Sequence, residues 1–437
     1  MERLNFPLRA LLWSRKAVFF GVLVTIVLLV NSFTMVQKAS RGHSDIGVFY
    51  QSALRLNHGG GAEVYKIRTE DKGWFRCIPP AGLAFFQPLA RFSPGISGFL
   101  WMLFNWVMLG AALVMLHRFL GRLDHQRRLY ASLFPWMAIL LVLMSVGSIQ
   151  VGQFSLLFTT CWIAYLLAAT RNRGFWMGLA LSLPSAIKIY PALMLMVPLA
   201  VKGRRSWKEI GFFVLGLVIF CAIIPTLFNG TRVVELSRSF VREVVFNPAG
   251  RMSEDLQVGS VSNQGLESIF LRYLSYDPPF HSQFAHFPHG NWPKEQVLRL
   301  ASGVRLAILG ISFGVVWRWR RRSLHHPIYG TLCMVALASA VLYLTMPGPK
   351  ARYAIYAFVA FLPLFGSVAA AARLNRRVSY RLRATLMVVC IAFILQFIPN
   401  VMRAYGCGFI GALFLWGTNL WLLIKQSKGS NEGCALG

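Results

Sequence analysis

The fold of this chain is decided by residues 171–205, which read RNRGFWMGLALSLPSAIKIYPALMLMVPLAVKGRR. The apolar middle of this stretch is longer than the roughly 20 residues that cross a bilayer, but two prolines flanking Lys188 interrupt it. Basic residues stand at both of its ends, Arg171 and Lys202 among them. Because short basic loops stay in the cytoplasm, the chain must leave the cytoplasm and return within this stretch. We therefore predict a hairpin of two short membrane helices with its tip at residues 185–190.

Apolar runs of similar length recur along the rest of the chain. Hydrophobic residues make up 56% of the 437 positions, which is more than a soluble globular chain can bury. The further runs lie at residues 17–36, 96–116, 131–147, 154–170, 208–228, 301–318, 327–346, 353–371, 384–400 and 405–424. Together with the hairpin they predict an all-α polytopic membrane protein with about twelve transmembrane helices. We expect residues 1–437 to form a single membrane-embedded unit with both termini in the cytoplasm.

The net charge of +30 agrees with this topology. Basic residues fall into short clusters between the apolar runs and at the termini, and every cluster fits a cytoplasmic location. Nucleic-acid binding, which such a charge often indicates, is therefore not expected. Two long segments then lie on the outer side of the membrane, a first outer loop at 37–95 and a second at 229–300.

Acidic residues are scarce, and their positions exclude one class of function. The chain has fifteen Asp and Glu residues, none in the middle of an apolar run. A proton-coupled transporter needs carboxylates within the membrane, so the sequence argues against that class. Most of the fifteen lie in the two long outer loops, where functional residues are expected. The carboxylate nearest the membrane is Asp45.

Asp45 begins an amphipathic segment in the first outer loop. The residues after it repeat at the spacing of one apolar helix face: Ile46, Phe49, Tyr50, Ala53 and Leu54. This spacing predicts a short helix on the membrane surface with its apolar side down. Asp45 then has two interpretations. It stabilises the helix N-terminus, or it is a general base at the lipid–water boundary, where a lipid-linked substrate presents its head group.

Three cations stand at outer helix ends. Lys188 lies at the tip of the predicted hairpin, and Lys350 and Arg352 follow a Pro-Gly-Pro turn at another outer end. An unpaired ammonium group near lipid is costly, so Lys188 either snorkels to the surface or binds an anion. Two cationic helix ends on one face suggest a site for a lipid phosphate, although contact with lipid head groups would produce the same pattern.

Neither the cysteines nor the histidines predict a metal site. The seven cysteines are scattered along the chain, whereas a metal centre needs clustered ligands. His281, His286 and His289 are close in sequence, but their aromatic and Pro-rich context favours a solvated loop over metal ligands. We therefore expect neither a metal nor another cofactor.

Several motifs, in this order, resemble the polyprenol-phosphate-mannose-dependent α-mannosyltransferases, glycosyltransferase family 87 of the GT-C superfamily. They are DIGVFY at 45–50, GAEVY at 61–65, PPAG…QPLA at 79–90, the pair Gly152-Gln153, AIKIYP at 186–191, and SNQGLES at 262–268 followed by Arg272. Two positions depart from the family pattern. Gly265 stands where the family often has Ser, and residues 350–353 read KARY where many members have a His-containing motif.

The resemblance implies a GT-C fold and a hexosyltransferase activity. It implies an inverting transfer of a sugar, mannose, from a polyprenyl-phosphate donor to a lipid-linked or glycan acceptor on the non-cytoplasmic side. Asp45 would be the general base, and Lys188, Lys350 and Arg352 would bind the donor phosphate. The similarity also nominates residues for substrate binding, namely His43, Tyr50, Gln153, Tyr190, Asn263, Gln264 and Arg272.

The expected partners are membrane lipids, the donor and the acceptor, and the expected location is the bacterial inner (plasma) membrane with the site facing the periplasm or exterior. Two other functions compete. An O-antigen ligase or polymerase has a similar number of spans but depends on outer Arg and His residues. A lipid-linked sugar flippase or transporter would line a central path with charged residues, of which the predicted spans have few, Arg305 among them.

Overall fold

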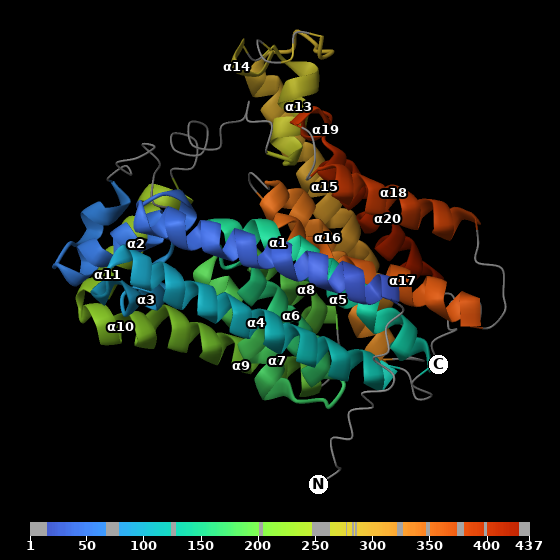
Figure 1. Ribbon diagram of the computed structural model, residues 1–437, viewed down its shortest axis with the longest axis horizontal. Coiled ribbons are helices and arrows are strands. Elements are labelled where there is room, and N and C mark those ends of the chain that lie inside the picture. Colours follow the sequence, from blue (N-terminus) through green and yellow to red (C-terminus); the bar gives the residue numbers. More distant parts are fainter. Residues whose placement is uncertain are drawn as a thin grey trace.

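The computed structural model describes residues 15–66, 78–123, 128–200, 204–246, 263–276, 278–281, 284, 286–320, 327–346, 350–373, 380–396 and 400–427. Within this part of the chain the regular structure is helical, and the only β pairing is an isolated bridge. Figure 1 shows long helices side by side, with α13 (Leu266–Leu274) and α14 (Pro278–His281) projecting from them. Residues 1–14 and 428–437, which contribute to the prediction of cytoplasmic termini, lie outside the described residues.

Seven helices in the described residues are long and apolar enough to cross a membrane. They are α1 (Arg15–Ser40), α4 (Pro94–Leu123), α5 (Arg128–Val151), α9 (Arg204–Val218) with its continuation through η5 (Ile219–Ile223) and α10 (Ile224–Asn229), α15 (Lys294–Arg320), α16 (Pro327–Thr345) and α20 (Cys407–Ser427). These helices confirm an all-α polytopic membrane protein.

The other five expected spans coincide with shorter apolar helices. They are α6 (Ser155–Ala169), α7 (Gly174–Ile187), η4 (Tyr190–Leu195) with α8 (Met196–Ala200), η7 (Ala351–Ala357) with α17 (Phe358–Arg373), and α18 (Tyr380–Leu395). Several of them are shorter than the length that crosses a bilayer unaided. Twelve crossings therefore remain a prediction.

The hairpin stretch folds as two helical segments that meet at Lys188. Helix α7 ends at Ile187, Lys188 is extended with φ −145° and ψ 137°, and η4 begins at Tyr190. Pro191 stands in the first turn of η4, where a missing N–H does not weaken the helix. The interruption at Lys188 thus ends one helix, starts the next and leaves the lysine at the turn.

Helix α7 packs closely against α9 because glycines remove side chains from the contact. A Cβ added at Gly178 would lie 2.6 Å from Cβ of Phe212, and one added at Gly216 would lie 2.1 Å from Oγ of Ser182. Both distances are shorter than van der Waals contact, so the two backbones approach as only small residues allow. The hairpin is therefore held on one side by direct helix–helix packing.

Short helices of the first outer loop lie across one end of this bundle. They are α2 (Ser44–Asn57), η2 (Ala62–Tyr65), α3 (Pro80–Phe86) and η3 (Leu89–Arg91), next to α11 (Arg232–Phe240) and η6 (Val241–Val245). The apolar face of α2 is buried at Ile46, Phe49 and Ala53. Phe49 packs against the rings of Phe86 and Phe154 at centroid distances of 5.1 and 5.5 Å. The chain itself, and not lipid, covers this face.

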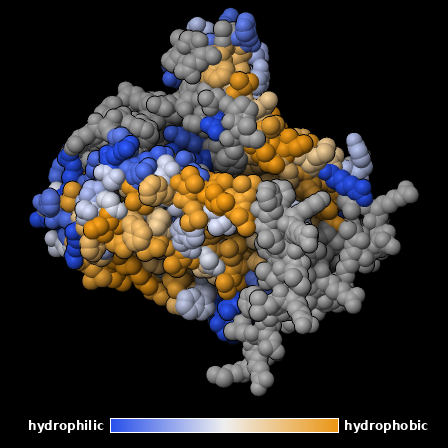
Figure 2. Space-filling model, in the orientation of Figure 1, coloured by the Kyte–Doolittle hydropathy of each residue, from blue (hydrophilic) through white to orange (hydrophobic). Residues whose placement is uncertain are grey.

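Helix α16 forms the centre of the other half of the molecule. Nearly all of its apolar length is buried, by α17, α20, α15 and η7 around it. Figure 2 shows apolar residues facing outward along the sides of the long helices and hydrophilic residues gathered at the end that carries α2 and α11. An apolar girdle with a polar end is the surface expected of a protein embedded in a bilayer.

Candidate functional site

Asp45 lies in the first turn of α2 and is 7% exposed. His43 occupies the N-cap position with extended backbone, and no side chain makes a capping hydrogen bond there. A carboxylate in the first turn still interacts favourably with the helix dipole. The carboxylate of Asp45 also contacts side chains from distant parts of the chain.

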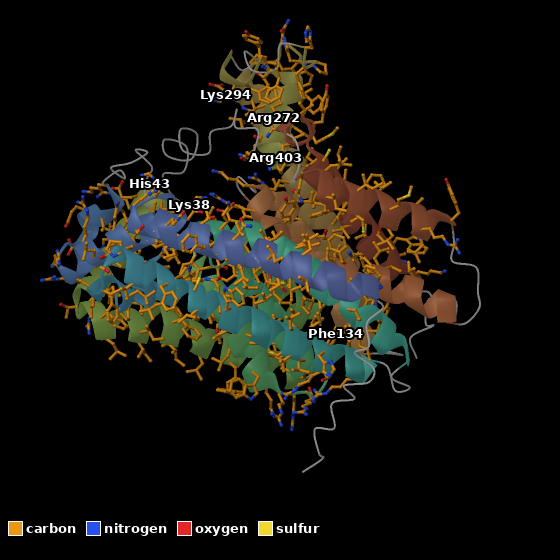
Figure 3. The ribbon with its side chains drawn as sticks, viewed as in Figure 1. Lys38, His43, Phe134, Arg272, Lys294 and Arg403 are labelled. Atoms are coloured by element: carbon orange, nitrogen blue, oxygen red, sulfur yellow. The ribbon has the colours of Figure 1, made fainter. Side chains whose placement is uncertain are left out.

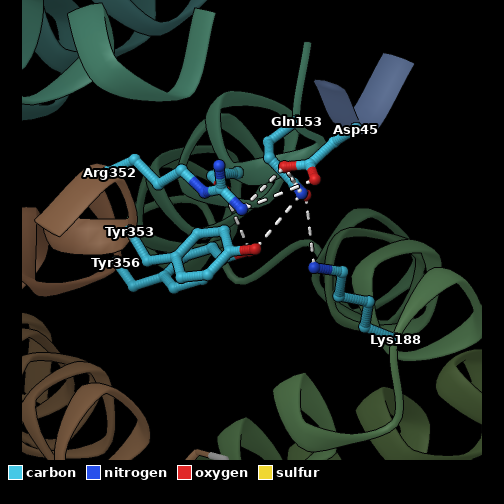
Figure 4. A network of polar contacts seen from close by, with 7 residues as sticks. Asp45, Gln153, Lys188, Arg352, Tyr353 and Tyr356 are labelled. Carbon is cyan, nitrogen blue, oxygen red and sulfur yellow. Dashed lines mark hydrogen bonds and ion pairs between the residues drawn. The ribbon is translucent and has the colours of Figure 1, made fainter. Parts of the chain in front are cut away.

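Two side chains from distant parts of the chain meet the carboxylate of Asp45 (Figure 4). Nη2 of Arg352 lies 3.1 Å from Oδ2 of Asp45, and the amide of Gln153 donates a hydrogen bond of 2.5 Å to the same oxygen. Arg352 follows Asp45 by 307 residues and Gln153 follows it by 108. Three expected site residues thus converge, from α2, from the turn before α6 and from η7.

Gln153 also links Asp45 to Lys188. Nζ of Lys188 donates to Oε1 of Gln153 at 3.3 Å, and Nε2 of Gln153 lies 3.2 Å from the hydroxyl of Tyr353. This orientation of the amide is the one that chemistry requires, because an ammonium group only donates and a carboxylate only accepts. The amide therefore connects a cation and an anion with the correct atom toward each.

The backbone before Gln153 sets its position. Gly152 has φ +74° and follows α5, with N–H···O bonds from Gly152 to Ile149 and from Gln153 to Ser148 of 3.0 and 3.1 Å. This pattern is a Schellman motif, which favours glycine at the left-handed position. A Cβ at Gly152 would lie 2.6 Å from Cβ of Ile46, so the turn also touches α2 directly. The glycine brings Gln153 and Asp45 together.

Lys188 is half-buried between aromatic rings. Its Nζ lies 5.6 Å from the centroid of the Tyr190 ring and 5.2 Å from that of Tyr353. Such ring faces attract a cation. The turn between α7 and η4 therefore directs the lysine toward the Asp45 network, and Tyr190, nominated from the sequence, lies beside it.

Two tyrosines of η7 that are absent from the expected site residues, Tyr353 and Tyr356, belong to the network. The rings of Tyr353 and Tyr356 stack with centroids 5.8 Å apart. The hydroxyl of Tyr356 lies 3.0 Å from Oγ of Ser155 and 3.3 Å from the hydroxyl of Tyr190. Their spacing of three residues, after an arginine, places both side chains on one face of a 3-10 helix. Two tyrosines three residues apart after an arginine were therefore the sequence pattern that could have nominated Tyr353 and Tyr356.

Lys350 and Asn263 form the isolated β bridge, which ties the second outer loop to the segment before η7. Oδ1 of Asn263 accepts the N–H of Gly265 at 2.9 Å, an Asx-type turn. Gln264 is 1% exposed and donates from Nε2 to the carbonyl of Arg403 at 2.9 Å. The described contacts of Lys350, Asn263 and Gln264 thus join separate loops to one another. Lys350 lies two positions before Arg352 in the chain.

Arg272 is completely buried next to α19 (Asn400–Ala404). Figure 3 labels Arg272 and Arg403 close together at this end of the molecule. Its Nη1 donates to the carbonyls of Arg403 and Ala404 at 2.9 and 3.0 Å, and Nη2 donates to the carbonyl of Asn263. A helix C-terminus leaves carbonyls without intrahelical partners, and this guanidinium satisfies two of them. These contacts give Arg272 a structural role, and its role in substrate binding stays a prediction.

Tyr50 and His43 lie apart from this network. The hydroxyl of Tyr50 donates to the carbonyl of Phe92 at 2.9 Å, and burial raises the pKa of this phenol. Tyr50 lines a separate cavity of about 680 Å³ at the far side of α2. His43 is exposed at the start of α2 (Figure 3). Neither is placed at the carboxylate of Asp45 by a described hydrogen bond.

No group of three or more His, Cys, Asp or Glu side chains lies close enough to hold a metal ion in the part of the chain that the structure describes. His281 and His289 lie near each other, with ring centroids 4.5 Å apart, in an aromatic cluster with Tyr276. That the protein uses no metal stays a prediction from the sequence.

The model of glycosyltransferase family 87 matches residues 78–345, well over half of the chain. The match includes Gln153, Lys188 and Arg272, whereas Asp45 lies before it and Arg352 after it. No curated protein matches the chain.

Proposed function

Since this chain belongs to glycosyltransferase family 87 and is thus a membrane glycosyltransferase, we propose that it transfers mannose from a polyprenyl-phosphate donor. The acceptor is a lipid-linked or glycan hydroxyl on the non-cytoplasmic side of the membrane. The reaction inverts the configuration at the anomeric carbon in one displacement, and Asp45 is its general base.

The observation that carries this proposal is the arrangement of charge around Asp45. One carboxylate contacts Arg352 at 3.1 Å and connects through Gln153 to Lys188. A transferase with a phosphate leaving group needs a single base for the acceptor and cations for the phosphate. The network contains both, and the family match supplies the reaction class.

In the proposed step, the acceptor oxygen attacks the anomeric carbon while its proton passes to a carboxylate oxygen of Asp45. The bond between the anomeric carbon and the phosphate oxygen breaks, and polyprenyl phosphate leaves with the electron pair. A phosphate leaving group is stable as an anion, so no general acid is required. Asp45 thus ends the step protonated and returns its proton to solvent.

Cations stabilise the charge that develops on the leaving phosphate. Arg352 is suited to this because a guanidinium binds two oxygens of a phosphate at once. It pairs with Asp45, and we propose that the donor phosphate shares this guanidinium. Lys188 acts as a compact point charge from the opposite side. Lys350, two residues before Arg352, would add a third positive charge.

The test is sugar transfer in liposomes that contain the purified chain, radiolabelled polyprenyl-phosphate-mannose and an acceptor lipid extract. Asp45→Asn keeps the size of the side chain and removes the base, so we expect a rate about a thousandfold lower. Glu63→Gln is the matched control, because Glu63 is a carboxylate of the first outer loop whose described hydrogen bonds are local, to the N–H groups of Gly61 and of Glu63 itself. Its rate should equal that of the wild type.

Three outcomes of the transfer assay would contradict part of this proposal. Equal transfer by wild type and Asp45→Asn would remove the base from the proposal and leave Asp45 as a helix-terminus residue. Transfer of other sugars but not of mannose would correct the donor and keep the mechanism. No transfer from any polyprenyl-phosphate sugar by a correctly folded wild type would overturn the donor class.

A further inference from the structure

The cavity of about 680 Å³ on the far side of α2 has no part in the reaction described above. Its walls come from three segments, namely the C-terminal half of α2, η3 with the residue after it, and the junction of α10 with α11. In Figure 1 these elements meet at the end of the molecule where Figure 2 shows hydrophilic residues gathered. The cavity therefore opens on the outer surface.

Helix geometry separates this cavity from the Asp45 network. Tyr50, a lining residue, follows Asp45 by five positions on α2. At 3.6 residues per turn the two side chains point about 140° apart. Leu54, one turn further, also lines the cavity. Leu56 lines the cavity as well, on nearly the same face as Asp45 but about three turns further along α2. The cavity is thus separated from the carboxylate by the helix face at Tyr50 and Leu54 and by the distance along the helix at Leu56.

Two arginines line the cavity. They are Arg91 and Arg232, and none of the described lining residues is Asp or Glu. Nη1 of Arg232 donates to the carbonyl of Gly59 at 3.3 Å, which holds its guanidinium over the C-terminal end of α2. Glu235 is exposed on the same helix but does not line the cavity. The lining therefore favours an anionic ligand.

A network of amides makes the inner wall rigid. Gln87 is 2% exposed and exchanges two hydrogen bonds of 2.9 Å with the side chain of Asn229. The amide of Asn57 donates to the carbonyl of Gln87 at 2.9 Å. Asn57 and Asn229 also line the cavity. They tie α2, α3 and α10 together, so the positions of the cations around this wall are set in advance.

The rim of the cavity is apolar and stands at the level where membrane helices end. Phe92 precedes α4 and is 49% exposed, and Phe228 is in the last turn of α10 and is 40% exposed. Aromatic side chains are enriched at this depth, between acyl chains and water. A ligand with a charged head and an apolar tail would thus meet the arginines and the aromatic rim together.

We propose that this cavity binds the phosphate-bearing head group of an anionic membrane lipid. The phosphate lies between Arg91 and Arg232, and the acyl chains leave along Phe92 and Phe228. The site is separate from the glycosyl-transfer site and does not depend on the function proposed for it. A lipid held there also braces the C-terminal half of the helix that carries Asp45.

The test is lipid binding to the full-length chain in detergent, measured by native mass spectrometry without any sugar donor. The probes are short-chain phosphatidylglycerol, phosphatidylcholine and inorganic phosphate. For the double variant Arg91→Gln/Arg232→Gln we expect phosphatidylglycerol affinity to fall about tenfold, because charge-assisted hydrogen bonds to the phosphate are lost. The matched control is Arg238→Gln/Arg299→Gln, which removes the same charge from exposed arginines outside the cavity.

Loss of affinity in the cavity variant alone, with phosphatidylglycerol bound better than phosphatidylcholine, would establish the site. An equal loss in the control variant would overturn it, because binding would then follow net charge. Equal affinity for phosphatidylcholine would overturn the anionic preference. If inorganic phosphate displaced the lipid at equal concentration, the apolar rim would contribute nothing and the lipid assignment would be wrong. Size-exclusion elution identical to the wild type shows that the variants are folded.

Discussion

Arg352 and Arg272 each collect polar groups from distant parts of the chain, yet they do so in different ways. Arg352 pairs with the side chain of Asp45, and the side chains of this pair are 20% and 10% exposed. Arg272 is fully buried and donates to main-chain carbonyls on either side of it. A guanidinium that pairs with a side chain at an accessible site can exchange that partner for a phosphate. One that satisfies buried carbonyls cannot leave them without cost.

The difference teaches how to separate reaction groups from structural groups in a membrane enzyme. The sequence predicts both arginines to lie outside the membrane core. The family motifs nominate Arg272, and the cationic helix end nominates Arg352. Their partners distinguish them. Arg352 pairs with a charged side chain, whereas Arg272 donates to three main-chain carbonyls and, among side chains, to the neutral hydroxyl of Ser268. Substitutions should therefore affect activity in one region and stability in the other.

The largest effect is expected at Arg352. Arg352→Gln removes the guanidinium that we propose for the donor phosphate, so the transfer rate should fall about a hundredfold to a thousandfold. The melting temperature of the purified chain should change little. Arg41→Gln, an exposed arginine ahead of α2, is the control and should retain full activity. A variant of Arg352 that loses stability but keeps its rate would remove the contrast with Arg272.

At Arg272 we expect the substitution to lower the free energy of unfolding. Arg272→Met keeps the length of the stem and leaves the carbonyls of Arg403 and Ala404 without these donors. Each buried carbonyl that loses its partner costs about 1–3 kcal/mol, so the free energy of unfolding should fall by roughly 3 kcal/mol. Denaturant titration measures this, with the exposed Arg299→Met as control. Unchanged stability with a lost rate would instead place Arg272 in substrate binding.

A smaller effect, on both stability and transfer rate, is expected at Gly152, because its turn positions Gln153 and also contacts α2. Gly152→Ala meets a left-handed backbone and a Cβ contact of 2.6 Å with Ile46, so we expect a loss of about 1–3 kcal/mol in the free energy of unfolding. The transfer rate should fall as well, because α2 must shift. Gly230→Ala is the control, since it shares a positive φ but has no atom within 4 Å of the new Cβ. Equal rates in both variants would show that the contact with α2 does not position Asp45.

The smallest effect is expected at Glu63, whose contacts are local and exposed. The N–H groups of Gly61 and of Glu63 itself hold the pKa of this carboxyl below its usual range. A lowered pKa contributes stability above the ordinary glutamate pKa, and this contribution disappears as the pH falls through the lowered value. Glu63→Gln should therefore cost less than about 1 kcal/mol at neutral pH and nothing in strong acid. Melting curves across this range would refute the assignment if the difference between wild type and variant grew toward low pH.

Local patterns in the sequence predict the helical, membrane-embedded class, and its motifs indicate the glycosyltransferase family. Runs of apolar residues and the basic residues between them act locally, since each run must satisfy its own backbone in lipid. The same local signals indicated that 171–205 turns back at Lys188. Charge and position nominated Asp45 and Arg352, and the likeness to the family nominated Gln153, before the proximity of these residues was known.

Only the tertiary structure decided which of these residues meet. Asp45 and Arg352 are separated by 307 positions, and a spacing of that size carries no information about contact. Packing on the Phe49 side of α2 turned the carboxylate toward Gln153 and placed Tyr50 in a different cavity. The role of Arg272 depended on where the carbonyls of α19 came to lie. Partners of this kind are set by the packing of whole helices, which no local pattern of residues records.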